Sequence, residues 1–268
     1  MALRVLTRSA YGSLVTLAVA KSHLGVSGVT EDAAIAALLE RVRGLFEGEL
    51  GRPLLRQRYL EALPVTSRHR VALSAYPIDA HQVTAEAYGD TLEADAIDPA
   101  AGILYRNAGW SGGTAGAEEA EPALEVTYYG GWLPPDAVQT WATGLTLAAG
   151  AWLRPTSPAL SPWLFEVTTA GATGAGPAAE PTWPTTAGET VTAGTAVLTA
   201  RDAVEVPAGV QAVALYVTGL LYSAGKREAG LTSLSADGFS ASWAATVAAA
   251  AGLPEEARRA LDPWRWSG

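Results

Sequence analysis

Few residues in this sequence have both the type and the spacing that catalysis or metal binding requires. The chain has three histidines, His23, His69 and His81, and none is at a metal-ligand spacing such as HxH or HExxH. It has no cysteine, which excludes thiolate nucleophiles and cysteine-ligated metals. The sequence therefore indicates no metal site.

Phosphate-binding and carboxylate chemistry have equally little support. No Walker-type GxxxxGK[ST] motif occurs, and the glycine-rich stretch 111–116 lacks the lysine that would hold a phosphate. Folding could still bring Glu166 close to Glu180 or Glu189, as in the carboxylate pairs of glycosidases. We predict that the chain is not an enzyme and binds no cofactor.

Two tryptophans are the candidates for ligand contact. Trp163 and Trp183 lie in a segment rich in Thr, Gly, Ala and Pro, and indole rings can stack on sugars. Most tryptophans in so small a segment are needed as core. A glycan-binding adsorption or decoration protein is therefore the alternative function.

The last forty residues carry spaced aromatic and arginine anchors in a segment poor in large aliphatic side chains. Such a segment orders on binding, and aromatic and arginine anchors are typical of interface hot spots. A short helix is expected after Pro254. The predicted contact residues are Phe239, Trp243, Leu253, Arg258, Arg259, Leu261, Trp264, Arg265 and Trp266.

Two capped helices and a strand occupy residues 15–58. Thr16 can cap a short helix closed by Gly25, and apolar residues from Ile35 to Leu50 recur at helical spacing in a second helix. Thr30 is the expected N-cap of that second helix, and Gly51 is its expected stop.

Strands and a third helix follow. Strand-like runs are expected at 55–63, 70–73, 82–88, 102–106 and 124–129, forming a small antiparallel sheet. A long helix apolar on more than one face is expected over 210–222, and such a helix must be buried on more than one side. Its predicted subunit-interface residues are Val210, Val213, Val217, Leu220 and Leu221.

The resulting prediction is an α+β fold with three parts. Residues 1–132 and 204–229 form a discontinuous core of helices and a short antiparallel sheet, 133–203 form an inserted all-β domain, and 230–268 form an extended C-terminal arm. The apolar run 210–222 is about half of the roughly 20 residues that span a bilayer, so we expect no membrane association.

Two motifs carry a resemblance to a known family. The order VTLxxAKxHL, a short acidic loop, an amphipathic helix and a GRPL turn before a strand resembles the opening of the tailed-bacteriophage head-tail connector (adaptor) family. The pattern KREG, a serine-rich stretch, DGFSASW and GLPxEARRALxPWR is similar to that family's C-terminal arm. After the short helix the chain has Trp264, Arg265 and Trp266, where the family has an aromatic residue followed by two arginines. Within the insertion, FEVTTAGATG resembles a small β module of phage tail and fibre proteins.

The resemblance implies a structural virion protein of the neck, assembled in the host cytoplasm. It implies a homo-oligomeric ring, a dodecamer matching the portal, with the portal protein and a downstream stopper or tail-completion protein as partners and the C-terminal arm at the portal. DNA would pass through the lumen without specific binding.

Charge along the chain agrees with that last expectation. Residues 1–60, 61–205 and 206–268 carry net charges of +3, −12 and 0. A protein that grips duplex DNA needs a basic face, whereas an acidic lumen would repel phosphate and let DNA slide.

Overall fold

The computed structural model describes residues 2–9, 12–64, 68–110, 123–157, 163–174, 180–225, 233–236, 239–242 and 253–265. It divides the chain into two compact units. One contains residues 1–11 and 53–205, and the other contains residues 12–52 and 206–268. Helices and antiparallel sheets are both present, which confirms the predicted α+β class.

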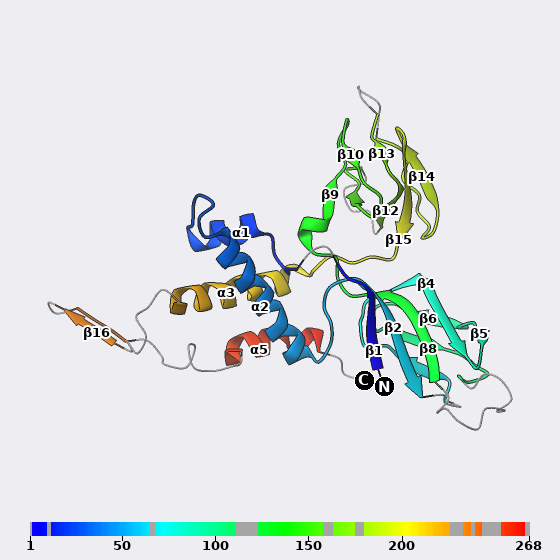
Figure 1. Cartoon of the computed structure of the whole chain (residues 1–268), viewed down its shortest axis with the longest axis horizontal. Coiled ribbons are helices and arrows are strands. Elements are labelled where there is room, and N and C mark those ends of the chain that lie inside the picture. The colour runs from blue at the N-terminus through cyan, green and yellow to red at the C-terminus, as the bar shows by residue number, and fades with distance from the viewer. Residues whose placement is uncertain are drawn as a thin grey trace. The chain divides into compact units, whose positions relative to one another are not determined.

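The first unit is built on a five-stranded antiparallel sheet in the order β1-β2-β8-β4-β5 (Figure 1). Its strands are β1 (Ala2–Thr7), β2 (Gln57–Pro64), β4 (Ile78–Ala87), β5 (Asp90–Leu92) and β8 (Ala123–Gly130). A three-stranded sheet in the order β3-β7-β6 belongs to the same core. Its strands are β3 (Arg70–Ala72), β6 (Ala96–Asp98) and β7 (Ile103–Tyr105).

A buried carboxylate lies inside this core. Glu61 is fully buried on β2 and accepts hydrogen bonds from the Ser74 amide at 2.9 Å, the Ser74 hydroxyl at 2.5 Å and the Tyr128 hydroxyl at 2.7 Å. Burial raises the pKa of Tyr128, and the adjacent Glu61 carboxylate raises it further. Because every contact is satisfied within the fold, Glu61 fixes the turn before β4 and is not available for chemistry.

The predicted insertion forms sheets of its own. A five-stranded sheet has the order β14-β15-β12-β11-β9, and a two-stranded ladder joins β10 to β13. Their bounds are β9 (Val138–Thr140), β10 (Thr146–Leu147), β11 (Trp152–Arg154), β12 (Leu164–Thr169), β13 (Gly171–Ala172), β14 (Thr190–Ala193) and β15 (Ala196–Arg201), with a short 3-10 turn η1 (Pro135–Ala137) before β9. Phe165, Leu198 and Trp183 lie in its hydrophobic core.

The ends of the insertion lie side by side. The Leu133 amide donates to the Val204 carbonyl at 2.8 Å, and Leu133 forms a parallel bridge with Glu205. The chain therefore enters and leaves the insertion at one point of the fold.

The second unit is helical. Its helices are α1 (Leu17–Leu24), α2 (Asp32–Leu50), α3 (Ala208–Gly225) and α5 (Glu255–Leu261), followed by the 3-10 turn η2 (Asp262–Trp264). A backbone hairpin of β16 (Ser233–Ala236) and β17 (Phe239–Ser242) also belongs to this unit. Helix α3 packs against α1, α2 and α5.

The helix termini test the sequence predictions directly. The Thr16 hydroxyl accepts from the Val19 amide at 3.1 Å, and Gly25 and Gly51 end α1 and α2 in the left-handed conformation, as predicted. The predicted cap Thr30 is wrong, because α2 begins one residue after Glu31, which makes no side-chain cap bond.

Candidate interaction surfaces

Helix α3 is the most conspicuous surface feature of the helical unit. Its 18 residues include no charged side chain, and only 22% of them are buried. The helix is longer than the predicted run 210–222, and by length and composition it could cross a membrane. Its buried face, which includes Val210, Ala214 and Val217, lies against the other helices of the unit.

The predicted interface residues of α3 divide into two groups. Val210 and Val217 are 0% and 1% exposed within the single chain, so they offer no surface to another subunit. Val213, Leu220 and Leu221 are only half-buried. Tyr216, which the sequence placed on a second apolar face but not among the interface residues, is 45% exposed on the opposite face of the helix. Its exposure could have been predicted from its spacing, since residues 212, 216 and 223 lie on one side of a helix with 3.6 residues per turn.

The C-terminal helix uses part of its predicted contact surface within its own unit. Helix α5 occurs where the sequence predicted a helix, but Leu253 and Leu261 are buried at 6% and 0% exposure. Arg258 and Arg265 both form ion pairs with Glu49 of α2, the first at 3.4 Å. These four residues hold the chain end on the helical unit. Leu253 and Leu261 have no surface left for a partner, whereas Arg258 and Arg265 each keep 46% of the side chain exposed.

The other predicted arm residues are placed as follows. Arg259 keeps 76% of its side chain exposed, with an ion pair to Glu255 at 3.1 Å. Trp264 is half-buried, and the Arg52 guanidinium donates to its carbonyl at 3.5 Å. Phe239 begins β17, whose backbone alone is described, and Trp243 and Trp266 lie outside the described residues.

The connection between α1 and α2 explains two residues of the N-terminal motif. The Lys21 ammonium donates to the Gly28 carbonyl and pairs with Asp32 at the start of α2. At the same end of that loop, next to Asp32, the Tyr222 hydroxyl of α3 donates to Glu31 at 2.7 Å. These contacts fix the helical hairpin against α3.

The two tryptophans proposed for glycan contact have different environments. Trp183 is 6% exposed, packs against Phe165 in a tilted arrangement with ring centroids 4.4 Å apart, and donates its indole N–H to Glu180 at 2.7 Å. Trp183 is therefore a core residue, and its predicted ligand role is wrong. Trp163 is half-buried and donates to the Thr185 carbonyl at 3.0 Å, so it alone keeps a partly open ring.

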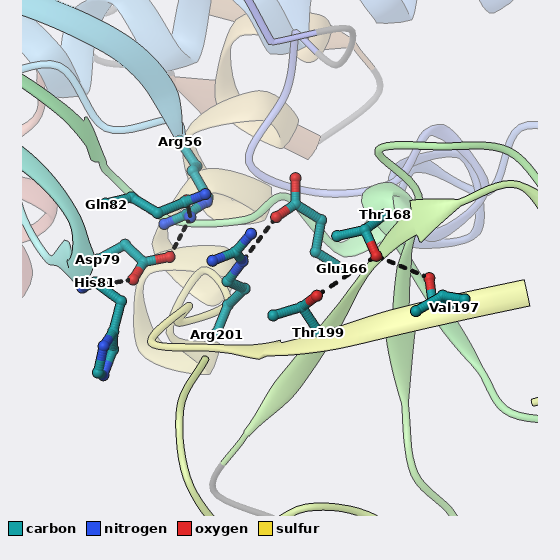
Figure 2. A network of polar contacts seen from close by, with 9 residues as sticks. All are labelled: Arg56, Asp79, His81, Gln82, Glu166, Thr168, Val197, Thr199 and Arg201. Atoms are coloured by element: carbon teal, nitrogen blue, oxygen red, sulfur yellow. Dashed lines mark hydrogen bonds and ion pairs between the residues drawn. The ribbon is translucent and has the colours of Figure 1, made fainter. Parts of the chain in front are cut away.

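A buried arginine that the sequence did not single out lies in the first unit. Figure 2 shows Arg56 beside Asp79 and Gln82, to which its Nη2 donates at 2.9 and 3.2 Å. The guanidinium carbon is 5.2 Å from the ring centroid of Tyr129 and 5.0 Å from that of Trp152. Burial lowers the pKa of Arg56, and the Asp79 carboxylate opposes that shift.

A second ion pair belongs to the same network. Figure 2 also shows Glu166 of β12 accepting from Arg201 of β15 at 2.8 Å. Glu166 is thus committed to Arg201, whereas Glu180 accepts from the Thr156 amide at 2.6 Å as well as from Trp183. Glu166 and Glu180, considered from the sequence as a catalytic pair, therefore each bind neighbouring side chains or backbone of the fold.

The described residues offer little else for catalysis. Among them, no group of three or more His, Asp or Glu side chains lies together as a metal site would require. Residues 109–113 read GWSGG and match the GxSxG spacing of a nucleophile elbow, but Ser111 lies outside the described residues. Gly109 follows a turn after β7, whereas the glycine of such an elbow directly follows a strand.

Comparison with known proteins gives matches of structure only. No protein-family model matches the chain, and no curated protein does. Part of the fold is similar to a chain in the neck of an empty gene transfer agent particle computed with C6 symmetry, at 17% identity and a TM-score of 0.39 over 49% of this chain and 72% of that chain. A chain in the virion of the native particle gives 19% identity and 0.36 over 49% and 72%. A chain in the neck of the native particle computed with C12 symmetry gives 17% and 0.38 over 50% and 71%.

Proposed function

We propose that this protein is a non-enzymatic structural component of the neck of a phage-like particle. In this proposal it forms an oligomeric adaptor ring between the portal and the tail, and DNA passes through the lumen. The motifs at both ends of the sequence support the family, and the exposed face of α3 is the observation that carries the proposal.

That face is unusual for a helix that meets only water. A helix at the surface of a soluble monomer normally alternates an apolar stripe with charged residues, and α3 has no charge on any side. Ala212, Tyr216 and Ser223 are exposed on it, with half-buried Val213 and Leu220 beside them. A contiguous uncharged surface of this kind marks a contact site.

We assign this face to the neighbouring copy of the chain. Small side chains beside one aromatic ring allow close helix packing with a single anchor, as in interface hot spots. A membrane is the less favourable occupant, because α2 packs on α3 and carries Glu40, Arg41 and Glu47. Inserting α3 would take these charges toward the hydrocarbon, at high cost.

Arm contacts with the portal rest on the residues that the helical unit leaves available. Of the described ones, Arg258, Arg259 and Arg265 are exposed and Trp264 is half-buried, so all four retain surface. Twelve copies, the portal as partner above and a stopper or tail-completion protein below follow the family resemblance. The strongly acidic middle of the chain suits a lumen that does not bind DNA.

To test the proposed subunit contact, we compare oligomer mass and portal binding between two substitutions that each introduce a glutamate. Tyr216→Glu places a carboxylate on the exposed face of α3, and we expect it to leave a folded monomer of about 27.7 kDa that does not co-sediment with portal as a ring. Ala37→Glu is the matched control, on an exposed position of α2. Light scattering after size exclusion, with and without portal protein, measures both.

The outcomes separate clearly. Assembly of wild type and Ala37→Glu but not of Tyr216→Glu supports the proposal. A wild-type chain that stays monomeric even with portal, or a Tyr216→Glu chain that assembles normally, contradicts it.

A further inference from the structure

A cavity of about 280 Å³ lies in the unit that holds the five-stranded sheet. Three arginines line it, Arg8, Arg56 and Arg58, together with the rings of Tyr129 and Trp152. The strand register places them, because Thr7 of β1 lies opposite Arg58 of β2, and Arg58 lies opposite Tyr129 of β8. The end of β1 therefore delivers Arg8 to the same edge as the start of β2.

The cavity is cationic in an acidic chain. The carboxylate in its lining is Glu166, and Arg201 already pairs with it at 2.8 Å. Arg8 and Arg58 are exposed, and neither has a carboxylate partner among the described residues. The net charge of the whole chain is −9, so the local positive charge of Arg8 and Arg58 differs in sign from the chain as a whole.

Arg56 supplies an unused buried donor. Its side chain is 4% exposed, and Nη2 donates to Asp79 and Gln82. Its Nη1 is buried and has no hydrogen-bond acceptor among the described residues. A buried donor without an acceptor is costly, and most such groups in folded proteins have a partner.

We propose that this cavity binds a phosphate group, with Arg56, Arg58 and Arg8 as its ligands. A phosphate monoester carries close to two negative charges at neutral pH and a backbone phosphodiester carries one, and both offer more acceptor oxygens to guanidinium groups than a single carboxylate does. The planar arginine fork matches phosphate geometry. The two sources of such a group are a small phosphate compound and the backbone of a nucleic acid.

The experiment measures binding of pyrophosphate to the full-length protein by isothermal titration calorimetry at fixed ionic strength. Arg8→Gln and Arg58→Gln should each weaken binding roughly tenfold, since each removes one charge-assisted contact from an exposed position that the fold does not need. Arg4→Gln is the matched control, because Arg4 is exposed on β1 but does not line the cavity. It should leave the affinity within about twofold of wild type.

A second titration with a short single-stranded oligonucleotide identifies the source. Competition with pyrophosphate assigns the site to nucleic-acid phosphate, and failure to compete assigns it to a small phosphate compound. The proposal is overturned if wild type does not bind pyrophosphate, or if Arg4→Gln weakens binding as much as the cavity variants do. Either result would leave assembly of the ring untouched, because Tyr216 does not line the cavity.

Discussion

At the scale of single residues, the polar network of the first unit depends on contacts that are distant in sequence. Arg56 contacts Asp79, which lies 23 residues later in the sequence, and Trp152, which lies much further along. No local sequence pattern therefore marks Arg56 as buried. Alternation along the strand would place an arginine outside. Trp183 failed as a ligand candidate for the same reason, since Phe165 and Glu180 cover it only after the insertion folds.

Asp202 gives this network a pH dependence. Burial raises the pKa of the Asp202 carboxyl and Asp79 raises it further, whereas His81 and Arg56 lower it. A carboxyl whose pKa is raised by folding opposes folding above that pKa and ceases to oppose it below its unfolded value of about 3.9. Asp202→Asn removes this unfavourable charge, so we expect it to increase the free energy of unfolding at pH 7 by less than about 1 kcal/mol. The contact with His81 at 3.7 Å, which the substitution also removes, is weak and offsets little of this gain.

Urea denaturation at pH 7 and at pH 4 checks this expectation. The gain should shrink toward pH 4, because the wild-type carboxyl then becomes increasingly protonated in the folded state. Asp90→Asn, at an exposed position of β5, measures the effect of an amide alone. A gain for Asp202→Asn that is equal at both pH values would contradict the role assigned to its charge.

At the scale of elements, helices with local caps were predicted well, whereas three strands were missed. Thr16, Gly25 and Gly51 act within a few residues of the helix that they end, so the sequence alone reveals them. Strands β1, β5 and β6 were missed. The first has every residue exposed and so shows no alternation, and the other two are three residues long.

The contact between α3 and the end of the chain can be tested with one methyl group. A Cβ added to Gly209, in the first turn of α3, would lie 2.6 Å from Cη2 of the Trp264 ring. Gly209→Ala should therefore displace Trp264 and lose the roughly 1 kcal/mol that alanine normally adds to a helix. Hydrogen exchange should become faster in α5, which adjoins Trp264.

Gly44→Ala is the matched control, because a Cβ at Gly44 in α2 has no neighbour within 4 Å. It should increase the free energy of unfolding by about 1 kcal/mol without changing exchange in α5. Equal stabilisation by both substitutions, with α5 still protected, would show that Trp264 does not pack on α3.

At the scale of the whole molecule, we expect the proposed ring to assemble without the predicted insertion. We expect a chain lacking residues 134–203, with a short glycine linker in their place, to assemble with portal. The deletion should lower the thermal midpoint of the first unit, because it removes Trp152 from Arg56. Co-sedimentation with portal and a thermal melt measure the two effects.

Trp152→Ala separates the causes in this experiment. It removes the ring beside Arg56 but keeps the insertion. Loss of assembly in the deletion alone would mean that residues 134–203 contribute to the ring. Loss in both would trace the defect to the surroundings of Arg56.

The single point of entry and exit at Leu133 and Val204 has a practical consequence. The hydrogen bond between these two residues means that any domain whose own termini lie close together can replace the insertion without stretching the sheet. A fluorescent protein or an affinity module spliced there would be displayed once per subunit. If the protein forms the proposed ring, such a graft would label the particle at a defined position without any change to the two ends of the chain.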